Sequence, residues 1–176
     1  MSLVTYAIAF GVVAAILGWL YRGRRGRHND AAWLPSELRT ATLYSSEAHY
    51  RLTDPIKLKG KADRIYRRRD GILVAIEFKS RFTARAFKND VIQLSAYAWA
   101  VSRTVGRDVA RHGYIVTVHP KTRTKQAIKV PLISEREIIT LYKRYADVRS
   151  SVVQAAKTTH KKLCQTCAYN DVCQQP

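Results

Sequence analysis

The chain has 176 residues and carries 31 Lys and Arg residues against 13 Asp and Glu residues, which gives a formal charge of +18. Hydrophobic residues make up 47% of the chain, which excludes disorder by composition and leaves enough material for one domain with an apolar core. The strongly basic balance favours a polyanionic partner, either nucleic acid or an anionic lipid surface.

The first feature along the chain is an uncharged apolar stretch from Leu3 to Tyr21. At a rise of ~1.5 Å per residue, a helix of this length spans a bilayer core of about 30 Å. An arginine-rich segment follows it, whereas a secretory signal peptide carries its positive charges before the apolar stretch. We therefore expect residues 1–21 to be a single-pass transmembrane anchor and residues 22–32 a basic linker, with a buried core helix as the alternative. The positive-inside rule then places the rest of the chain on the cytoplasmic side of the inner membrane.

Residues 33–159 are expected to form one α/β domain, with a mixed central β-sheet flanked by helices. Hydrophobic periodicity and turn residues mark its elements. In chain order, these are a segment of mixed helical character over 36–49, strands over 58–68 and 72–79, a helix over 90–101, strands over 113–118 and 127–130, and a last helix from 134 to about 155.

Two acidic residues lie on the two arms of the predicted hairpin. A two-residue loop at Asp70-Gly71 would turn Asp63 away from Glu77, whereas a three-residue loop over 69–71 would set the two opposite each other. The longer loop needs a left-handed residue at its last position, and Gly71 adopts that conformation at little cost. We therefore predict the three-residue loop.

Glu77 and Lys79 are two residues apart on a predicted strand, so their side chains leave the same face. The apolar residues Val74, Ile76 and Phe78 then occupy the other, buried face. Two neighbouring carboxylates repel each other unless a cation lies between them, and oxygen ligands of this kind suit Mg²⁺ or Mn²⁺. A lysine beside them suits hydrolysis of a phosphodiester. Solvated surface charges on a strand are the alternative.

Gln93 and Tyr97 are four residues apart on the predicted helix and share one face of it. Because a buried amide needs hydrogen-bond partners, Gln93 is a candidate to contact a metal-site water or the DNA backbone. An ordinary core helix with one polar edge residue is the alternative.

Three segments in this order, GKAD over 60–63, EFKS over 77–80 and QLSAY over 93–97, resemble the motifs of the PD-(D/E)XK nuclease superfamily. Within it, the Q-x-x-x-Y pattern after the E-x-K strand is most similar to the RecB-like branch, which includes the CRISPR-associated exonucleases of the Cas-four type. Members of the family often carry an acidic or histidine residue upstream on the first helix, and Glu47 and His49 are the candidates.

This resemblance implies a restriction-endonuclease-like core that uses Mg²⁺ or Mn²⁺. It makes Asp63 and Glu77 the metal ligands and Lys79 the catalytic lysine. Gln93 and Tyr97 would be the helix motif of the same site.

The three cysteines of the chain, Cys164, Cys167 and Cys173, all lie near its C-terminus. In the RecB-like branch, three cysteines with this spacing join one distant N-terminal cysteine to hold a [4Fe–4S] cluster. This chain has no cysteine before Cys164. His160 is a candidate fourth ligand that would favour Zn²⁺ or an atypical cluster, and an exogenous ligand or a partner chain are the other candidates. We expect residues 160–176 to form a Cys-rich metal-binding tail, with a tail that binds no metal as the alternative.

Basic residues flank the acidic centre on both sides along the sequence, which suits a track for nucleic-acid phosphates. Tyr66 and Phe82 are candidates to stack on unpaired bases, although core packing is an equal alternative for both.

Together these features predict a membrane-tethered, metal-dependent DNA nuclease, acting as an exonuclease on single strands or DNA ends. Its partners would be DNA and the membrane, with no small-molecule substrate, and the resemblance adds DNA repair or CRISPR-adaptation proteins. One alternative is a catalytically silent, membrane-anchored module that binds nucleic acid. Another is a lipid-binding scaffold, which leaves the acidic pair and the cysteines unexplained.

Overall fold

The computed structural model describes residues 32–158, 161–165 and 167–173. The chain divides into two compact units between Glu135 and Arg136. The expected anchor over 1–21 lies outside the described residues, as does His160. Within the described part, no helix is long and apolar enough to cross a membrane.

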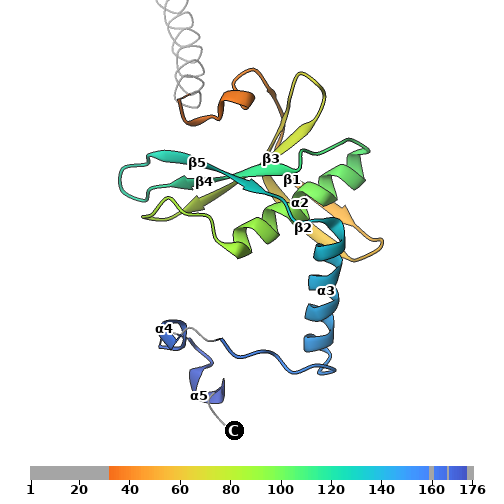
Figure 1. The fold of residues 1–176 in the computed structure, drawn as a ribbon, viewed down its shortest axis with the longest axis vertical. Coiled ribbons are helices and arrows are strands. Elements are labelled where there is room, and N and C mark those ends of the chain that lie inside the picture. Colours follow the sequence, from red (N-terminus) through yellow and green to blue (C-terminus); the bar gives the residue numbers. More distant parts are fainter. Residues whose placement is uncertain (1–31, 159–160, 166, 174–176) are drawn as a thin grey trace, which may run out of the picture. The chain divides into compact units, whose positions relative to one another are not determined.

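The first unit is built on a five-stranded sheet of β1 (Thr42–Leu52), β2 (Leu58–Arg67), β3 (Leu73–Ser80), β4 (His112–Val118) and β5 (Lys125–Pro131). The strands are hydrogen-bonded to one another in the order of the chain, and Figure 1 labels each of them. All neighbours are antiparallel except β3 and β4, which are parallel. Helix α2 (Lys88–Val105) makes the crossover between these two strands and packs on four strands of the sheet. The predicted mixed α/β architecture is therefore confirmed.

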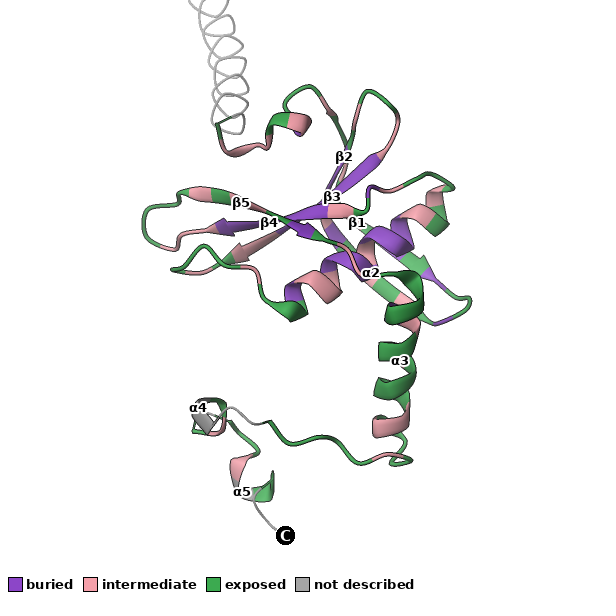
Figure 2. Ribbon diagram, in the orientation of Figure 1, coloured by how far each residue is buried: buried purple, intermediate pink, exposed green. Residues whose placement is uncertain are grey.

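Both faces of the sheet are covered, so the central strand β3 is buried on both sides. Leu73 and Ala75 belong to the core beneath α2, whereas Val74 and Ile76 belong to a second core on the opposite face. This division follows from the alternation of side chains along a strand. Figure 2 shows the buried residues concentrated in β3, β4 and α2. The second core also contains Leu38 from the short 3₁₀ turn η1 (Ser36–Leu38).

The predicted strands and the predicted helix over 90–101 are confirmed, with small shifts in their ends. The expectation of helical character over 36–49 is wrong, because all but the η1 turn and a short connection belongs to strand β1. Strand β1 pairs with β2 along its length, so its state is decided by a partner strand and not by its own propensity.

Three further helices lie in the described residues: α3 (Glu135–Arg149), which begins at the boundary between the two units, and α4 (Lys161–Cys164) and α5 (Asn170–Cys173) in the second unit. The predicted last helix is thus present but ends at Arg149, before the expected end near 155. The segment that follows it is not helical up to residue 158.

Candidate active site

The hairpin of β2 and β3 sets the register of the two acidic residues. Its hydrogen-bonded pairs leave residues 69–71 as the loop, and Gly71 closes this loop with a φ of 84°. The predicted three-residue loop is confirmed. The same register, continued by one residue beyond the last ladder pair, sets Asp63 opposite Glu77.

Asp63 lies where the regular pairing of β2 with β3 stops. The ladder ends between Arg64 and Ile76, although both strands continue beyond this pair. There, the backbone N–H of Phe78 donates to Oδ2 of Asp63 at 2.8 Å. A carboxylate thus takes the place of a backbone acceptor, which fixes Asp63 at the point where the two strands open.

The carboxylate of Glu77 is buried, and only one of its two oxygens is hydrogen-bonded to a described residue. The residue is 4% exposed, and its Oε1 accepts a bond of 2.9 Å from Nζ of Lys79. Its Oε2 is buried and has no hydrogen-bond partner among the described residues. Burial raises the pKa of Glu77, and the charge of Asp63 raises it further, against the lowering effect of Lys79. A buried carboxylate oxygen without a donor is costly unless something positive meets it.

Helix α2 holds the lysine in place through two polar side chains. Nζ of Lys79 donates to Oε1 of Gln93 at 2.7 Å, and Nε2 of Gln93 donates to the Tyr97 hydroxyl at 3.2 Å. The structure therefore links both residues of the helix motif to Lys79. The oxygen of the Gln93 amide therefore has a protein partner, Lys79.

The Tyr97 ring packs directly on the backbone of Gly60. A Cβ atom added at Gly60 would lie 2.6 Å from Cδ1 of the Tyr97 ring, which is closer than real side chains approach. The glycine that opens the GKAD segment is therefore needed for the position of Tyr97. Sequence reasoning did not identify this contact, although a glycine inside a strand is a known sign of close backbone approach.

A buried ion pair connects the end of β3 to the start of α2, and sequence reasoning missed it. Asp90 is 1% exposed and accepts bonds of 2.9 and 3.0 Å from the Arg81 guanidinium. It also accepts a bond of 2.9 Å from the backbone N–H of Phe87. Burial alone would raise the pKa of Asp90, but Arg81 and this N–H outweigh it and lower the pKa. The pair fixes the strand that carries Lys79 against the helix that carries Gln93.

The two upstream candidates, Glu47 and His49, lie on strand β1, so their expected place on a helix is wrong. Glu47 falls between the ladder pairs on either side of Asp63, which sets it opposite that residue across β1 and β2. Its backbone has a φ of 54°, and its exposed side chain forms an ion pair with Lys61. His49 is exposed and is paired in register with Lys61.

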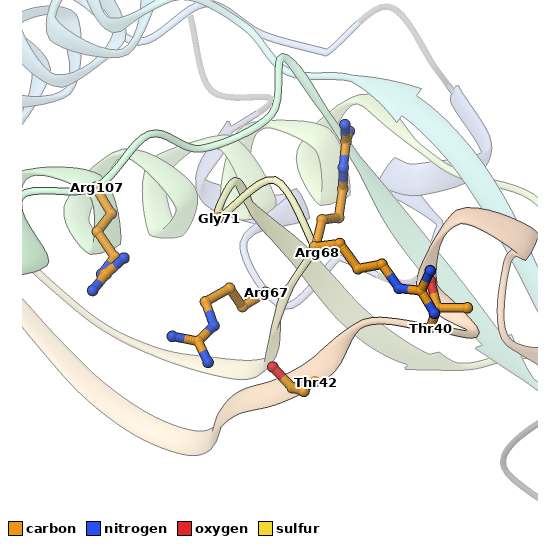
Figure 3. Close-up of a pocket in the computed structure, with 7 residues that line it drawn as sticks. Thr40, Thr42, Arg67, Arg68, Gly71 and Arg107 are labelled. Carbon is orange, nitrogen blue, oxygen red and sulfur yellow. The ribbon is translucent and has the colours of Figure 1, made fainter.

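Arginines gather at the loop end of the hairpin, away from Asp63 and Glu77. They line a pocket of about 280 Å³ together with Thr42 at the start of β1 and Thr40 just before it. Figure 3 shows Arg67 and Arg107 extending toward the same side of the hairpin. Of the two candidates for base stacking, Tyr66 is buried in the core, so that role is wrong for it, whereas Phe82 is 67% exposed. The pocket residues are Thr40, Thr42, Arg67, Arg68, Arg69, Gly71 and Arg107.

Asp63 and Glu77 provide a fitting pair of ligands for a divalent cation. A positive group would stabilise both the unpartnered Oε2 of Glu77 and the like negative charge of Asp63 beside it. Mg²⁺ is commonly bound through one or two carboxylates and keeps several water ligands, so a larger cluster of side chains is not required. Among the described residues, no group of three or more His, Cys, Asp or Glu is arranged to hold a metal ion.

The three cysteines of the second unit line one cavity of about 430 Å³. They are not close enough, with the other described residues, to form a ready metal-binding group. The expected metal-binding tail over 160–176 thus stays a prediction.

Comparison with known proteins gives the family of this chain. The family described as the PD-(D/E)XK nuclease superfamily matches residues 7–174, and the chain belongs to this superfamily. No curated protein matches the chain.

Two solved structures are similar to the chain. The crystal structure of the protein designated SSO0001 has a TM-score of 0.46 and 22% identity, over 92% of this chain and 70% of that one. A Eubacterium rectale protein described as a candidate exonuclease has a TM-score of 0.44 and 14% identity, over 75% of this chain. The match covers 53% of the Eubacterium rectale protein, so the chain spans about half of its length.

Proposed function

We propose that the protein is a divalent-cation-dependent DNA nuclease that hydrolyses phosphodiesters in single strands or at DNA ends. One observation carries the proposal: the carboxylate of Glu77 is buried beside Asp63 and Lys79, and one of its oxygens has no donor in the described ranges 32–158, 161–165 and 167–173. Membership of the PD-(D/E)XK nuclease superfamily supports a nucleic-acid substrate. The formal charge of +18 suits a polyanion.

In this proposal, Asp63 and Glu77 hold Mg²⁺ or Mn²⁺. When bound, such an ion lowers the pKa of a water molecule and neutralises charge on the phosphate. The backbone N–H of Phe78 fixes the Asp63 carboxylate, so the ligand is positioned before the ion arrives.

Lys79 supplies the positive charge that the chain itself brings to the reaction. Its ammonium group is held between Glu77 and Gln93, with donor distances of 2.9 and 2.7 Å. An ammonium has three donors, so one N–H remains to meet a phosphate oxygen as negative charge develops on it. Gln93, held in turn by Tyr97, keeps the ammonium at that place.

The RecB-like branch and its cellular setting are part of the same proposal. The Q-x-x-x-Y pattern over 93–97 supports a likeness to exonucleases of the Cas-four type, and with it DNA repair or CRISPR-adaptation proteins as partners. The apolar stretch from Leu3 to Tyr21 supports a single-pass tether in the inner membrane, with the nuclease domain facing the cytoplasm. The test is a reporter that works only in the periplasm, fused after Pro176. Activity of this reporter would contradict the proposed orientation.

We also propose a metal site in the tail, because the three cysteines line the same cavity. Cys164, Cys167 and Cys173 all line it, which supports a [4Fe–4S] cluster or a Zn²⁺ ion with a further ligand. Metal analysis and the visible absorbance of anaerobically purified protein test this. A colourless, metal-free protein with full activity would contradict it.

The test of the nuclease proposal is cleavage of single-stranded and double-stranded DNA by the full chain, with Mg²⁺ or Mn²⁺ and with a chelator. We expect cleavage to need the cation and to fall at least about 100-fold in Asp63→Ala and in Lys79→Ala. Asp70→Ala is the matched control, because Asp70 is an exposed carboxylate at the other end of the same hairpin. Its cleavage rate should be that of the unchanged protein.

The competing function is a catalytically silent module that only binds nucleic acid. The arginine pocket favours this function, because arginines can bind phosphates without any acidic centre. Binding without any cleavage under both cations would support the module and contradict the nuclease. Cleavage that survives in Asp63→Ala would contradict the assigned site.

A further inference from the structure

A small cavity of about 200 Å³ lies between the loop that follows β3 and the hairpin of β4 and β5. Arg81 and Phe82 line it from the loop, and Thr117, His119 and Gln126 line it from the hairpin. None of these side chains has a part in the proposed hydrolysis. The cavity is thus a separate feature of the first unit.

The cavity adjoins the proposed active site on the same face of the sheet. In the parallel register of β3 and β4, Lys79 is paired with Thr117. Ile115 belongs to the core beneath α2, and Thr117 is two residues further along the strand, so its side chain leaves the same face. Adjacent strands are about 4.8 Å apart, so the cavity begins one strand away from Lys79.

An exposed aromatic ring forms one wall of the cavity. Phe82 is 67% exposed, and its ring meets the His119 ring edge-on, with centroids 5.5 Å apart and planes at 87°. The backbone N–H of Thr122 donates to Nδ1 of His119 at 3.1 Å. This bond assigns the ring proton to Nε2, which keeps a donor available to a ligand. The cavity thus combines an open aromatic face with a polar edge.

The loop that presents Phe82 is fixed at its base. The Arg81 guanidinium bonds Asp90 and also donates to the backbone carbonyl of Arg85 at 2.9 Å. The backbone N–H of Arg81 donates to the carbonyl of Val118 at 3.2 Å. A ligand would therefore meet a stacking surface that is already ordered, which lowers the entropic cost of binding.

We infer that this cavity takes one unpaired base of the nucleic-acid strand whose phosphate lies at Asp63 and Glu77. Phe82 stacks on the base, while His119 and Gln126 meet its polar edge. The volume is below the 300 Å³ or so of a typical small-molecule pocket, so it suits a single ring system.

A paired base is covered on both faces by its neighbours and cannot enter without being flipped out of the stack. The inference rests on the proposed nuclease function and deepens it: the site selects strands with an unpaired base next to the cleaved phosphate.

The experiment is a binding measurement with the full chain in the presence of a chelator, so that no strand is cleaved. The probes are single-stranded oligonucleotides in which one base at a time is replaced by an abasic nucleotide. We expect the abasic replacement at one position to weaken binding by about 10- to 100-fold. Phe82→Ala should weaken binding of the intact strand by a similar factor and show no further loss with that abasic strand.

Three variants separate stacking from a general loss of apolar surface. Phe82→Tyr retains an aromatic face and should bind as the unchanged protein does, whereas Phe82→Leu should behave like Phe82→Ala. Leu43→Ala is the control, because Leu43 is 52% exposed on β1 and lies outside the cavity. Gln126→Ala gives a second variant of the cavity and should reduce the discrimination between intact and abasic strands.

Equal affinity for intact and abasic strands at every position, together with cleavage that depends on Asp63, would overturn the base pocket and leave the nuclease standing. An unchanged affinity in Phe82→Ala would overturn it as well. A chain that binds no strand and cleaves none would overturn both proposals.

Discussion

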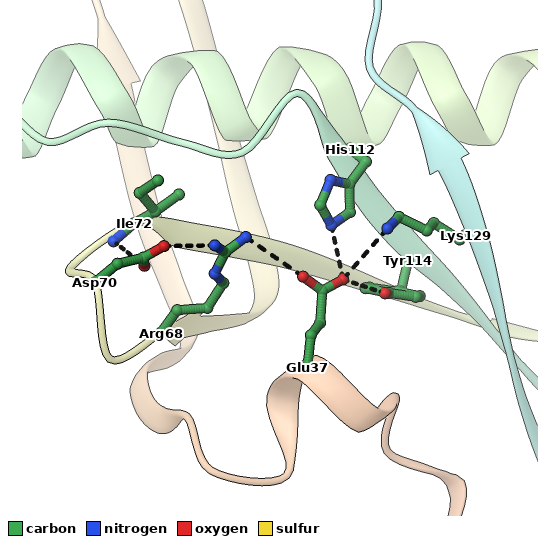
Figure 4. Close-up of polar contacts among 7 residues, drawn as sticks. All are labelled: Glu37, Arg68, Asp70, Ile72, His112, Tyr114 and Lys129. Atoms are coloured by element: carbon green, nitrogen blue, oxygen red, sulfur yellow. Dashed lines mark hydrogen bonds and ion pairs between the residues drawn. The ribbon is translucent and has the colours of Figure 1, made fainter.

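Glu37 and Glu77 each place a carboxylate against the same sheet, one on each face, and the two differ in how many donors surround them. Glu37 comes from the η1 turn and meets the face opposite α2, where donors from three strands or their ends converge on it, as Figure 4 shows. Within the part of the chain that the structure describes, Glu77 has one donor, Lys79. The partners of Glu37 are Tyr114, His112 at 2.7 Å, Arg68 at 3.4 Å and Lys129 at 3.7 Å.

The pKa values of the two carboxylates shift in opposite directions for this reason. Burial alone would raise the pKa of Glu37, but the hydrogen bonds of Tyr114 and His112 outweigh it and lower the pKa. At Glu77, burial and the neighbouring Asp63 prevail over Lys79 and raise the pKa. The fold can therefore satisfy a carboxylate when the role is structural. At Glu77, one carboxylate oxygen has no donor among the described residues, and the proposed cation would meet that oxygen.

The largest expected effect is the loss of cleavage in Glu77→Gln, which keeps the shape of the side chain and removes its charge. We expect cleavage to fall by about 10²- to 10³-fold. The free energy of unfolding in chelator should stay the same or rise by up to about 1 kcal/mol, because an under-compensated buried charge is removed. Cleavage assays and urea unfolding of the same preparations check both parts. A marked loss of stability would contradict the contrast with Glu37.

Glu37→Gln should give the reverse pattern. Replacing the charged acceptor by an amide weakens several bonds at once, and we expect a loss of about 2–3 kcal/mol in the free energy of unfolding. Cleavage should change by no more than about twofold, because the cluster lies on the other face of the sheet. A large loss of cleavage in a variant that remains folded would show that the two faces are coupled.

The sequence predicted the hairpin and its register because the signals for them are local. Gly71 permits the left-handed end of the loop, and the two-residue alternation along the strand puts Val74, Ile76 and Phe78 on one face and Glu77 and Lys79 on the other. The spacing of Gln93 and Tyr97 on one helix is equally local. These signals were enough to predict that the five proposed site residues come from three adjoining elements.

The features that sequence reasoning missed depend on distant partners. Glu37 lies 77 positions before Tyr114 in the chain, so no local pattern connects them. Strand β1 lacks a clean apolar period, and its pairing with β2 determines its structure. The contact of Tyr97 with Gly60 also exists only after α2 has packed on the sheet.

Gly60→Ala tests whether the proposed site around Glu77 depends on the packing of helix α2 against strand β2. The added Cβ overlaps the Tyr97 ring, so we expect a cost of about 1–2 kcal/mol in the free energy of unfolding and slower cleavage. Gly71→Ala is the matched control, because a Cβ there meets open space and only the φ of 84° opposes it. It should cost about 1 kcal/mol without slowing cleavage. Equal cleavage rates in the two variants would contradict the role of the Tyr97 position.

The smallest expected effect is in the pH dependence of stability, where the two carboxylates should give changes of opposite sign. The pKa of Glu37 is below its usual value of 4.5 in the folded chain, so the stability that it contributes is present above about pH 4.5 and is lost as the pH falls through the folded pKa. The pKa of Glu77 is above 4.5, so its cost grows as the pH rises above about 4.5 and is complete above the folded pKa. The measurement is urea unfolding in chelator between about pH 3 and pH 7. Near pH 7, the free energy of unfolding should be higher for the unchanged protein than for Glu37→Gln, and higher for Glu77→Gln than for the unchanged protein. Both differences should shrink as the pH falls.

The part of each difference that changes with pH should be no more than about 1 kcal/mol, because the Glu37 side chain is still 25% exposed and partly screened. If both variants changed the free energy of unfolding in the same direction, the donors around the two carboxylates would have equivalent effects. That result would contradict the difference between Glu37 and Glu77.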